Sequence, residues 1–169
     1  RSEISHDMCS RCPPGTMQPK KGQHSCLSCA PGSFMPDHGG ISCISCDVVG
    51  DAYAEQMGQT SCSLCPQHTQ RFIGHLNATT RAACICQHGF YSTVGEPGSA
   101  CMPCPRGAKC TGRQENPVPD SGFILSTREN AAHIQKVFVV RCEPPEACKG
   151  GRNSSCAIGY AGRRCGECA

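Results

Sequence analysis

Cysteine is the feature of this sequence that most restricts its fold. Eighteen of the 169 residues are cysteine, which exceeds the share of about 8–10% that marks a secreted disulfide scaffold. Leu, Ile, Val and Phe together supply 24 of the 169 residues. This share, about 14%, is below the roughly 20% under which an uncrosslinked chain tends to remain disordered. A large apolar core is therefore excluded, and covalent cross-links must offset the conformational entropy of the ordered chain.

The cysteines recur at regular intervals. The units between successive pairs share an early glycine, extended interior residues and a late glycine before the closing cysteine, as in CPPGTMQPKKGQHSC and CAPGSFMPDHGGISC. Because glycine suits turns that require a positive φ, each unit is predicted to be a short irregular hairpin. A C-x-C begins at Cys84, and six C-x2-C pairs begin at Cys9, Cys26, Cys43, Cys62, Cys101 and Cys165.

The spacing also predicts how the cysteines pair. Neighbours in a C-x2-C pair rarely bond each other in a structural site, because the small ring would be strained. We therefore expect the first cysteine to close the preceding loop and the second to open the next one. Each loop of about 15 residues contributes roughly 3 kcal/mol in the chain-entropy model. The predicted pairs are Cys12–Cys26, Cys29–Cys43, Cys46–Cys62, Cys65–Cys84 and Cys86–Cys101.

This pairing defines the fold class that we expect. The chain is predicted to be a small disulfide-rich protein with little helix, built as an elongated ladder of short irregular β-hairpin modules. Each module would contact only its neighbours in the sequence, as in other repeat proteins.

The first repeats carry a recognisable motif. The segment CPPGTMQPKKGQHSCLSCAPGSFMPDHGGISC contains CPxG or CAPG, then Met or an aromatic residue, glycine and C-x2-C. Through this motif, residues 9–104 resemble ephrin-receptor-like cysteine-rich repeats, which are related in style to the modules of tumour-necrosis-factor receptors. The unit that begins at Cys46 departs from the pattern, with Asp47 where Pro or Ala is usual. The resemblance implies an extracellular, non-enzymatic module.

The C-terminal segment carries a second resemblance. Residues 156–165, CAIGYAGRRC, are similar to the last loop of an epidermal-growth-factor-like module, which implies a bond between Cys156 and Cys165. We expect three domains: tandem cysteine-rich repeats at 1–104, a linker with short strands at 105–141, and a partial EGF-like module at 142–169.

The remaining cysteines are assigned by bookkeeping. If the two loops with five intervening residues close on themselves, Cys104 bonds Cys110 and Cys142 bonds Cys148. Cys9 and Cys168 then remain. We expect these two to form disulfides with flanking sequence or with another subunit.

Residues 111–141 contain no cysteine and hold the densest apolar cluster. Phe123–Leu125 and Val137–Val140 have the β-branched and aromatic content of strands, so we predict two short strands that pack against the terminal module. The alternative is one or two helical turns over 127–135, because Ser126 and Glu129 fit a capping box.

Zinc binding is the main chemical alternative. Cys9, Cys12, Cys26 and Cys29 have the spacing of a four-thiolate zinc finger, which would make the chain an intracellular zinc protein. The spacing continues into further modules, however, and no basic amphipathic helix follows Cys29. We therefore expect oxidised sulfurs and predict no metal and no cofactor.

Other functional classes find little support. The sequence has no nucleophile motif, phosphate loop or paired acid–base constellation, so no enzyme is predicted. The net charge of +3 comes without a run of more than two basic residues, so no nucleic-acid partner is expected. No apolar stretch reaches the roughly 18 residues that span a bilayer. Without a charged, apolar leader before Arg1, we expect a mature chain or part of a longer one.

The functional prediction follows from these observations. Asn77-Ala78-Thr79 and Asn153-Ser154-Ser155 are sequons, so N-linked glycans are expected on Asn77 and Asn153. The leading hypothesis is an extracellular structural or adhesive segment of a surface protein or filament, a disulfide-stapled rod that contacts other extracellular proteins or copies of itself. The alternative is a receptor ectodomain fragment that binds a protein ligand, through residues 111–141 in particular.

Overall fold

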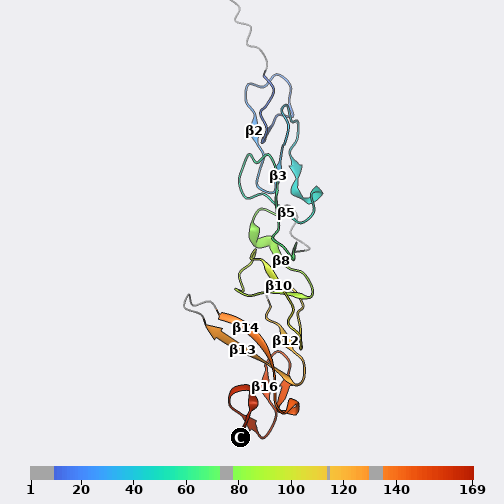
Figure 1. Ribbon diagram of the computed structural model, residues 1–169. Helices are drawn as coiled ribbons and strands as arrows, with labels where there is room; N and C mark the ends of the chain where they lie inside the picture. Colours follow the sequence, from blue (N-terminus) through green and yellow to red (C-terminus); the bar gives the residue numbers. More distant parts are fainter. Residues whose placement is uncertain (1–9, 73–77, 114, 130–134) are drawn as a thin grey trace, which may run out of the picture. The chain divides into compact units, whose positions relative to one another are not determined.

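The chain forms two compact units built almost entirely of short hairpins (Figure 1). The structure is a computed structural model and describes residues 10–72, 78–113, 115–129 and 135–169. Unit 1 comprises Arg1–Cys65 and Arg71–Ala83, and unit 2 comprises Pro66–Gln70 and Cys84–Ala169. The predicted fold class is confirmed, since the chain is disulfide-rich, its strands pair as antiparallel hairpins, and its helical turns are short.

Unit 1 contains three hairpins of two-residue strands. In each, the strand after a turn pairs antiparallel with the strand that lies inside the next C-x2-C pair, as when Thr16 lies opposite Ser28. Two single 3-10 turns complete the unit: η1 (Cys46–Val48) and η2 (Arg81–Ala83). The paired strands are β1 (Thr16–Met17) with β2 (Leu27–Ser28), β3 (Ser33–Phe34) with β4 (Ile44–Ser45), and β5 (Ala52–Tyr53) with β6 (Ser63–Leu64).

Unit 2 contains further hairpins and the longest strands that the structure describes. The long pair is β13 (Phe123–Glu129) with β14 (Gln135–Arg141), in which Phe123 lies opposite Arg141. Two 3-10 turns are present, η3 (Pro145–Ala147) and η4 (Arg163–Cys165). The other pairs are β7 (Thr69–Arg71) with β8 (Cys84–Cys86), β9 (Phe90–Ser92) with β10 (Cys101–Pro103), β11 (Ala108–Lys109) with β12 (Val118–Pro119), β15 (Cys148–Gly150) with β16 (Ser155–Cys156), and β17 (Tyr160–Ala161) with β18 (Glu167–Cys168).

One turn geometry opens hairpins in both units. At its first occurrence, the N–H of Thr16 donates to the carbonyl of Pro13 at 3.2 Å, and Gly15 has a φ of 81°. The carbonyl of Gly15 then accepts a hydrogen bond from the N–H of Cys29 at 2.9 Å. This second bond fixes where the next unit begins. The same two bonds recur with Gly32, His68, Gly89, Gly122 and Gly159 in the place of Gly15.

The recurrence extends the repeat beyond the segment in which the cysteine spacing is regular. The turn at Gly122 lies in the stretch expected to be a linker, and the turn at Gly159 lies in the stretch that resembles an EGF-like loop. At Gly122 the position three residues earlier is Pro119 rather than cysteine. The cysteine pattern therefore marks the turn in most units but fails to mark this one.

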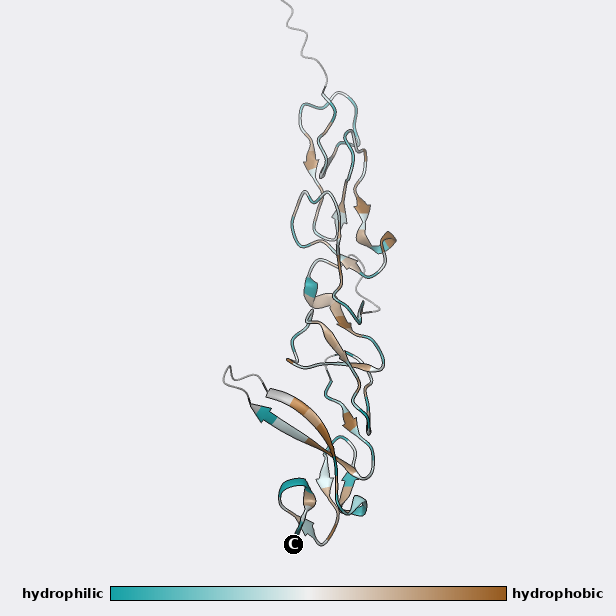
Figure 2. Ribbon diagram, viewed as in Figure 1, coloured by the Kyte–Doolittle hydropathy of each residue, from teal (hydrophilic) through white to brown (hydrophobic). Residues whose placement is uncertain are grey.

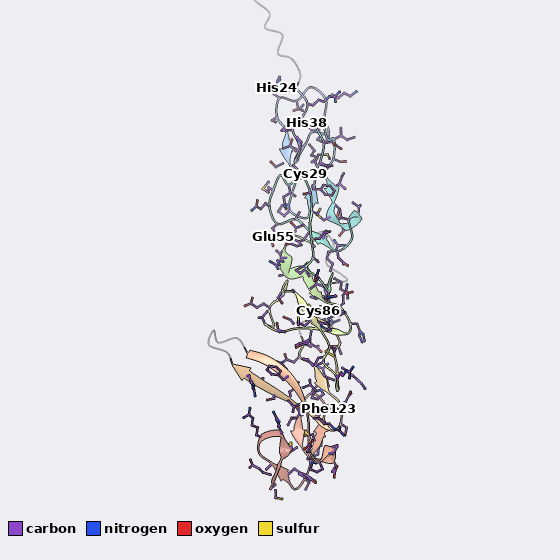
Figure 3. All side chains as sticks on the ribbon, viewed as in Figure 1. His24, Cys29, His38, Glu55, Cys86 and Phe123 are labelled. Atoms are coloured by element: carbon purple, nitrogen blue, oxygen red, sulfur yellow. A yellow bond between two sulfur atoms is a disulfide. The ribbon has the colours of Figure 1, made fainter. Side chains whose placement is uncertain are left out.

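Cysteine side chains provide most of the fully buried core. Apart from Pro117, the largest side chains with less than 2% exposure are all cysteines. Cys29 in unit 1 and Cys86 in unit 2 are labelled in Figure 3. Since few large apolar side chains are available, burial of disulfides takes the place of an aliphatic core. The buried cysteines of this group are Cys29, Cys46, Cys84, Cys86, Cys142, Cys148 and Cys165.

The cysteine-free segment forms the predicted pair of strands. Phe123–Glu129 is a strand throughout, and Gln135 begins β14. The alternative of helical turns is therefore wrong for residues 127–129 and 135, and its remaining part, 130–134, lies outside the described residues. Ile124 packs against a buried cluster of Cys142, Ala147, Cys148 and Cys165. The predicted packing of this segment on the terminal module is confirmed.

Backbone hydrogen bonds connect successive modules of unit 1. The N–H of Gly15 donates to the carbonyl of Met35 at 2.8 Å, and the N–H of Gly58 donates to the carbonyl of Cys29 at 2.8 Å. These bonds bring Gly15 so close to Gly58 that a Cβ on Gly15 would overlap the carbonyl of Gly58. Glycine is therefore required at position 15 both for its positive φ and for this approach.

The Gly15 contact generates a stability prediction with a matched control. Gly22 has a similar φ of 75°, but nothing lies within 4 Å of a Cβ built on it. Gly22→Ala should therefore cost only the left-handed strain of about 1–2 kcal/mol. Gly15→Ala should cost about 1–3 kcal/mol more, because the added methyl group displaces a neighbouring backbone. Denaturant unfolding of the disulfide-intact chain measures both, and equal losses would contradict the close approach.

Candidate functional site

Four of the five disulfides predicted from the spacing are confirmed. In the pair Cys26-x2-Cys29, the first cysteine bonds back to Cys12 and the second bonds forward to Cys43. Cys65 and Cys84 are also disulfide-bonded, and Cys9 lies outside the described residues. The other bonds are Cys46–Cys62, Cys86–Cys101, Cys104–Cys110, Cys142–Cys148 and Cys156–Cys165.

The zinc alternative loses its ligands in this arrangement. A four-thiolate site needs reduced sulfurs, but Cys12, Cys26 and Cys29 are each in a disulfide. In the part of the chain that the structure describes, no group of three His, Cys, Asp or Glu side chains is arranged to hold a metal ion. The cysteines thus act as covalent cross-links.

Cys168 is an exposed free cysteine. It lies on β18 opposite Tyr160 of β17, and Cys165, three residues earlier, bonds back to Cys156. The N–H of Ala169 donates to the carbonyl of Gly159, as the N–H of Cys29 does to Gly15. Cys168 therefore takes the register position of Ser28, and Ala169 takes that of Cys29, so this pair is shifted by one residue relative to Cys26-x2-Cys29.

The sequon at Asn153 lies on an exposed turn between β15 and β16. Asn153 and Ser155 are both exposed, and Ser154 has a φ of 45°. The hydroxyl oxygen of Ser154 accepts a hydrogen bond from the N–H of Leu125 at 2.7 Å, which ties the turn to β13. The turn thus presents the sequon while its middle residue anchors it. The other predicted site, Asn77, lies outside the described residues.

A charged cluster supports the same turn. The hydroxyl of Thr111 donates to Oε2 of Glu115 at 2.8 Å, and Nη2 of Arg152 donates to the same oxygen at 3.1 Å. The hydrogen bond from Thr111, followed by the charge of Arg152, lowers the pKa of Glu115. Because the folded pKa is lowered, the stabilising contribution is present above the unfolded pKa of the carboxyl and is lost as the pH falls through the folded value.

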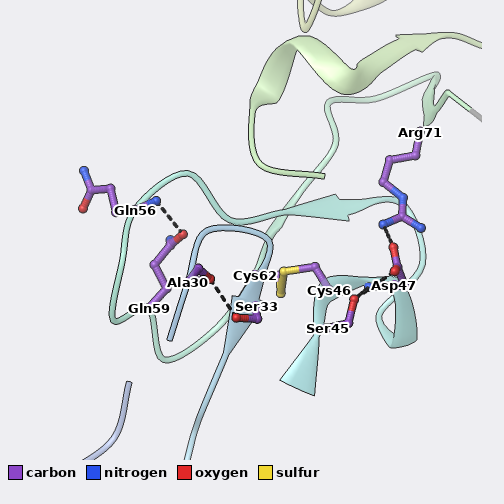
Figure 4. Close-up of a disulfide and its surroundings, with 9 residues drawn as sticks. All are labelled: Ala30, Ser33, Ser45, Cys46, Asp47, Gln56, Gln59, Cys62 and Arg71. Atoms are coloured by element: carbon purple, nitrogen blue, oxygen red, sulfur yellow. Dashed lines mark hydrogen bonds and ion pairs between the residues drawn. A yellow bond between two sulfur atoms is a disulfide. The ribbon is translucent and has the colours of Figure 1, made fainter. Parts of the chain in front are cut away.

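The unit that begins at Cys46 has Asp47 where the repeat pattern usually has Pro or Ala, and this residue makes polar contacts (Figure 4). Asp47, which follows Cys46, forms an ion pair with Arg71, and its Oδ2 accepts a hydrogen bond from the hydroxyl of Ser45 at 2.9 Å. The N–H of Arg71 donates to Oδ1 of Asp51 at 2.7 Å. Two carboxylates beside the Cys46–Cys62 disulfide therefore hold Arg71 in place.

Exposed apolar side chains recur inside the C-x2-C pairs of unit 1. Leu27 is 50% exposed and lies opposite Met17, while Ile44 is 36% exposed and lies opposite Phe34. Facing residues of an antiparallel pair lie on the same side of the hairpin, so each hairpin presents an apolar pair. Sequence analysis missed these positions, although an apolar residue inside a C-x2-C pair is a signal that could have identified them.

The β13–β14 hairpin contains a run of hydrophobic residues, which is brown along β14 in Figure 2. Val137 is buried, whereas Phe138 beside it on β14 is 36% exposed. The hairpin is a two-stranded sheet, so each strand pairs along one edge only. The outer edge of β13 is partly occupied, because the N–H of Leu125 donates to the hydroxyl oxygen of Ser154.

Comparison with known proteins identifies the N-terminal repeats. Residues 2–42 match the family model described as tyrosine-protein kinase ephrin type A/B receptor-like. This segment therefore contains ephrin-receptor-like cysteine-rich repeats, a receptor-type module of the kind found outside cells. No curated protein matches the chain. Among the described residues, no helix combines the length and apolar character needed to cross a bilayer.

The state of Cys168 generates a prediction. In the monomeric fraction of the folded, non-reduced chain, a maleimide should modify the C-terminal peptide that contains Cys168, because its thiol is exposed there. Cys165 in the same peptide should stay unmodified, since it is buried in a disulfide. Peptide mapping by mass spectrometry distinguishes them, with Cys168→Ser as the control. Labelling of Cys165, or a bond between Cys168 and a cysteine of the described residues, would contradict this assignment.

Proposed function

We propose that this chain is a structural or adhesive segment of an extracellular surface protein or filament. Its stapled hairpins act as a rod-like spacer and as an interaction surface, and no catalysis or cofactor is assigned to it. The supporting observation is the repeated connection between successive hairpin modules. A disulfide closes one hairpin, and the turn carbonyl of that hairpin accepts a hydrogen bond from the first N–H of the next. Such connections favour stiffness without requiring a large core.

The location and partners in this proposal follow from the chemistry of the surface. Disulfides persist in oxidising compartments, and the receptor-like match at residues 2–42 is in accord with an extracellular position. N-linked glycans on Asn77 and Asn153 would keep these sites solvated. Disulfides of Cys9 and Cys168 would continue the series of cross-links into flanking sequence or another subunit. The partners are other extracellular proteins or copies of the chain itself.

Adhesion through the apolar pairs predicts reversible self-assembly. The full glycosylated chain with Cys168→Ser, which excludes disulfide-linked oligomers through this position, should associate as its concentration rises in sedimentation experiments. Leu27→Ser combined with Ile44→Ser should weaken association at least tenfold, because both side chains are exposed and would be buried in the contact.

The control for this experiment is Val94→Ser combined with Ile158→Ser, which removes two exposed apolar side chains from unit 2. If both double variants weakened self-association equally, the loss would reflect the general hydrophobicity of the surface and not a specific contact of Leu27 and Ile44. A chain that stays monomeric at millimolar concentration, with no fibres in negative-stain images, would refute the adhesive proposal.

The second candidate function is a receptor ectodomain fragment. The observation that favours it is the β13–β14 hairpin, whose half-exposed apolar residues include Phe138. On this proposal, the monomeric chain should bind saturably to cells that display the protein ligand. Phe138→Ser should abolish that binding, whereas the Leu27→Ser and Ile44→Ser pair should leave it unchanged. The opposite pattern would remove the hairpin as the ligand site.

A further inference from the structure

A polar hollow lies in the first module of unit 1, apart from the apolar pairs. Its volume is about 480 Å³, within the range of roughly 300–1,000 Å³ of small-ligand sites. The Cys12–Cys26 disulfide contributes to its wall. We call it the basic hollow, and the polar side chains that line it are Ser10, Gln18, Lys20, Gln23 and His24.

The walls of the basic hollow are fixed by hydrogen bonds. Nε2 of Gln18 donates to the carbonyl of Ser25 at 2.7 Å, and its Oε1 accepts from the N–H of Lys20 at 3.1 Å. On the other wall, the N–H of Gly39 donates to the carbonyl of Cys12 at 2.7 Å. The loop that carries Lys20 is thus held in shape before any ligand binds, which lowers the entropy lost on binding.

Positive charge gathers around this hollow, and none of the described residues that line it is Asp or Glu. Lys20 lines it, Lys21 follows on the same exposed loop, and the side chain of Arg11 lies against Gly39 of the wall. Among the residues that the structure describes, no ion pair is recorded for these three cations. Residues 10–46 contain a single acidic residue, Asp37.

The next module has the opposite charge. Residues 47–65 contain Asp47, Asp51 and Glu55 and no Lys or Arg. Asp47 and Asp51 are held by Arg71, and Oε1 of Glu55 accepts a hydrogen bond from the N–H of Arg81. The three carboxylates of residues 47–65 therefore have partners within the protein, whereas the three cations of the first module remain for an external anion.

We infer that the basic hollow binds a sulfated glycan. Lys and Arg attract the sulfate groups, while Gln23, His24 (labelled in Figure 3) and Ser10 offer hydrogen-bonding groups to sugar hydroxyls. Cations inside the hollow and at its edge suit a chain of several anionic groups rather than one small ion. The choice of a glycan rests on the extracellular location of the proposed function, whereas the attraction for sulfate rests on the hollow itself.

Two other polyanions fit this surface less well. No Phe, Tyr or Trp side chain lines the hollow, so single-stranded nucleic acid would find only the imidazole of His24 for the stacking that such sites use. The lining also offers no large aliphatic side chain, so a lipid headgroup would bind without an apolar contact for its chains. Single-stranded DNA and anionic lipid vesicles are therefore included in the test as competing ligands.

The test measures binding of a defined sulfated hexasaccharide to the full disulfide-intact chain by calorimetry. The affinity should fall with added salt, because exposed charges are screened, and the desulfated hexasaccharide should bind at least tenfold more weakly. Combining Arg11→Gln, Lys20→Gln and Lys21→Gln should also reduce the affinity at least tenfold. The matched control combines Arg106→Gln, Lys149→Gln and Arg163→Gln, which removes three exposed cations of unit 2, and should change the affinity less than twofold.

A second measurement locates the site without any substitution. In the ¹⁵N-labelled wild-type chain, the sulfated hexasaccharide should shift amide resonances of residues 18–24 and 39–40. Absence of these shifts at saturation, equal losses in the two triple variants, or no binding at millimolar ligand would overturn the inference. Equal or tighter binding of anionic lipid vesicles or single-stranded DNA would also overturn it. Self-association of the chain is scored separately, so failure here leaves the adhesive proposal intact.

Discussion

The structure depends on one combination of bonds: in the repeats with regular cysteine spacing, a disulfide closes the hairpin and a turn carbonyl receives the backbone of the next module. In the first module, Cys12–Cys26 closes the loop and the carbonyl of Gly15 accepts the N–H of Cys29. The disulfide restricts the unfolded chain, whereas the hydrogen bond sets the start of the following module. Together they allow a chain with few large apolar residues to adopt defined modules.

The cysteine spacing predicted this framework because the physical rule behind it is local. Two cysteines separated by two residues on a short strand point into different loops, so Cys26 and Cys29 bond in opposite directions. The strand content of Phe123–Leu125 and Val137–Val140 was equally readable, since β-branched and aromatic residues dominate both segments. The cysteine pattern and the strand propensity were thus sufficient to predict most of the fold.

The features that sequence missed depend on contacts between residues far apart in the chain. The turn at Gly122 has no cysteine three residues before the glycine, so its similarity to the turn at Gly15 is seen only in its hydrogen bonds. The substitution of Asp47 looked like a simple departure from the pattern, yet it provides the partner of Arg71, which is 24 residues away. The basic hollow likewise forms where the loop of one hairpin meets the turn of the next, which spacing alone does not indicate.

The turn connection also separates what can vary from what cannot. The bonded cysteines of four loops are 14, 14, 16 and 15 residues apart. In the first three of these loops, the turn carbonyls of Gly15, Gly32 and Asp51 nevertheless reach the N–H of the next cysteine at the same 2.9 Å. The two extra residues of the Cys46–Cys62 loop lie in its opening turn, which contains η1, because Ala52 and Leu64 pair at the same separation as Thr16 and Ser28. Such an architecture permits evolution to remodel a loop for a new contact without disturbing how one module is joined to the next.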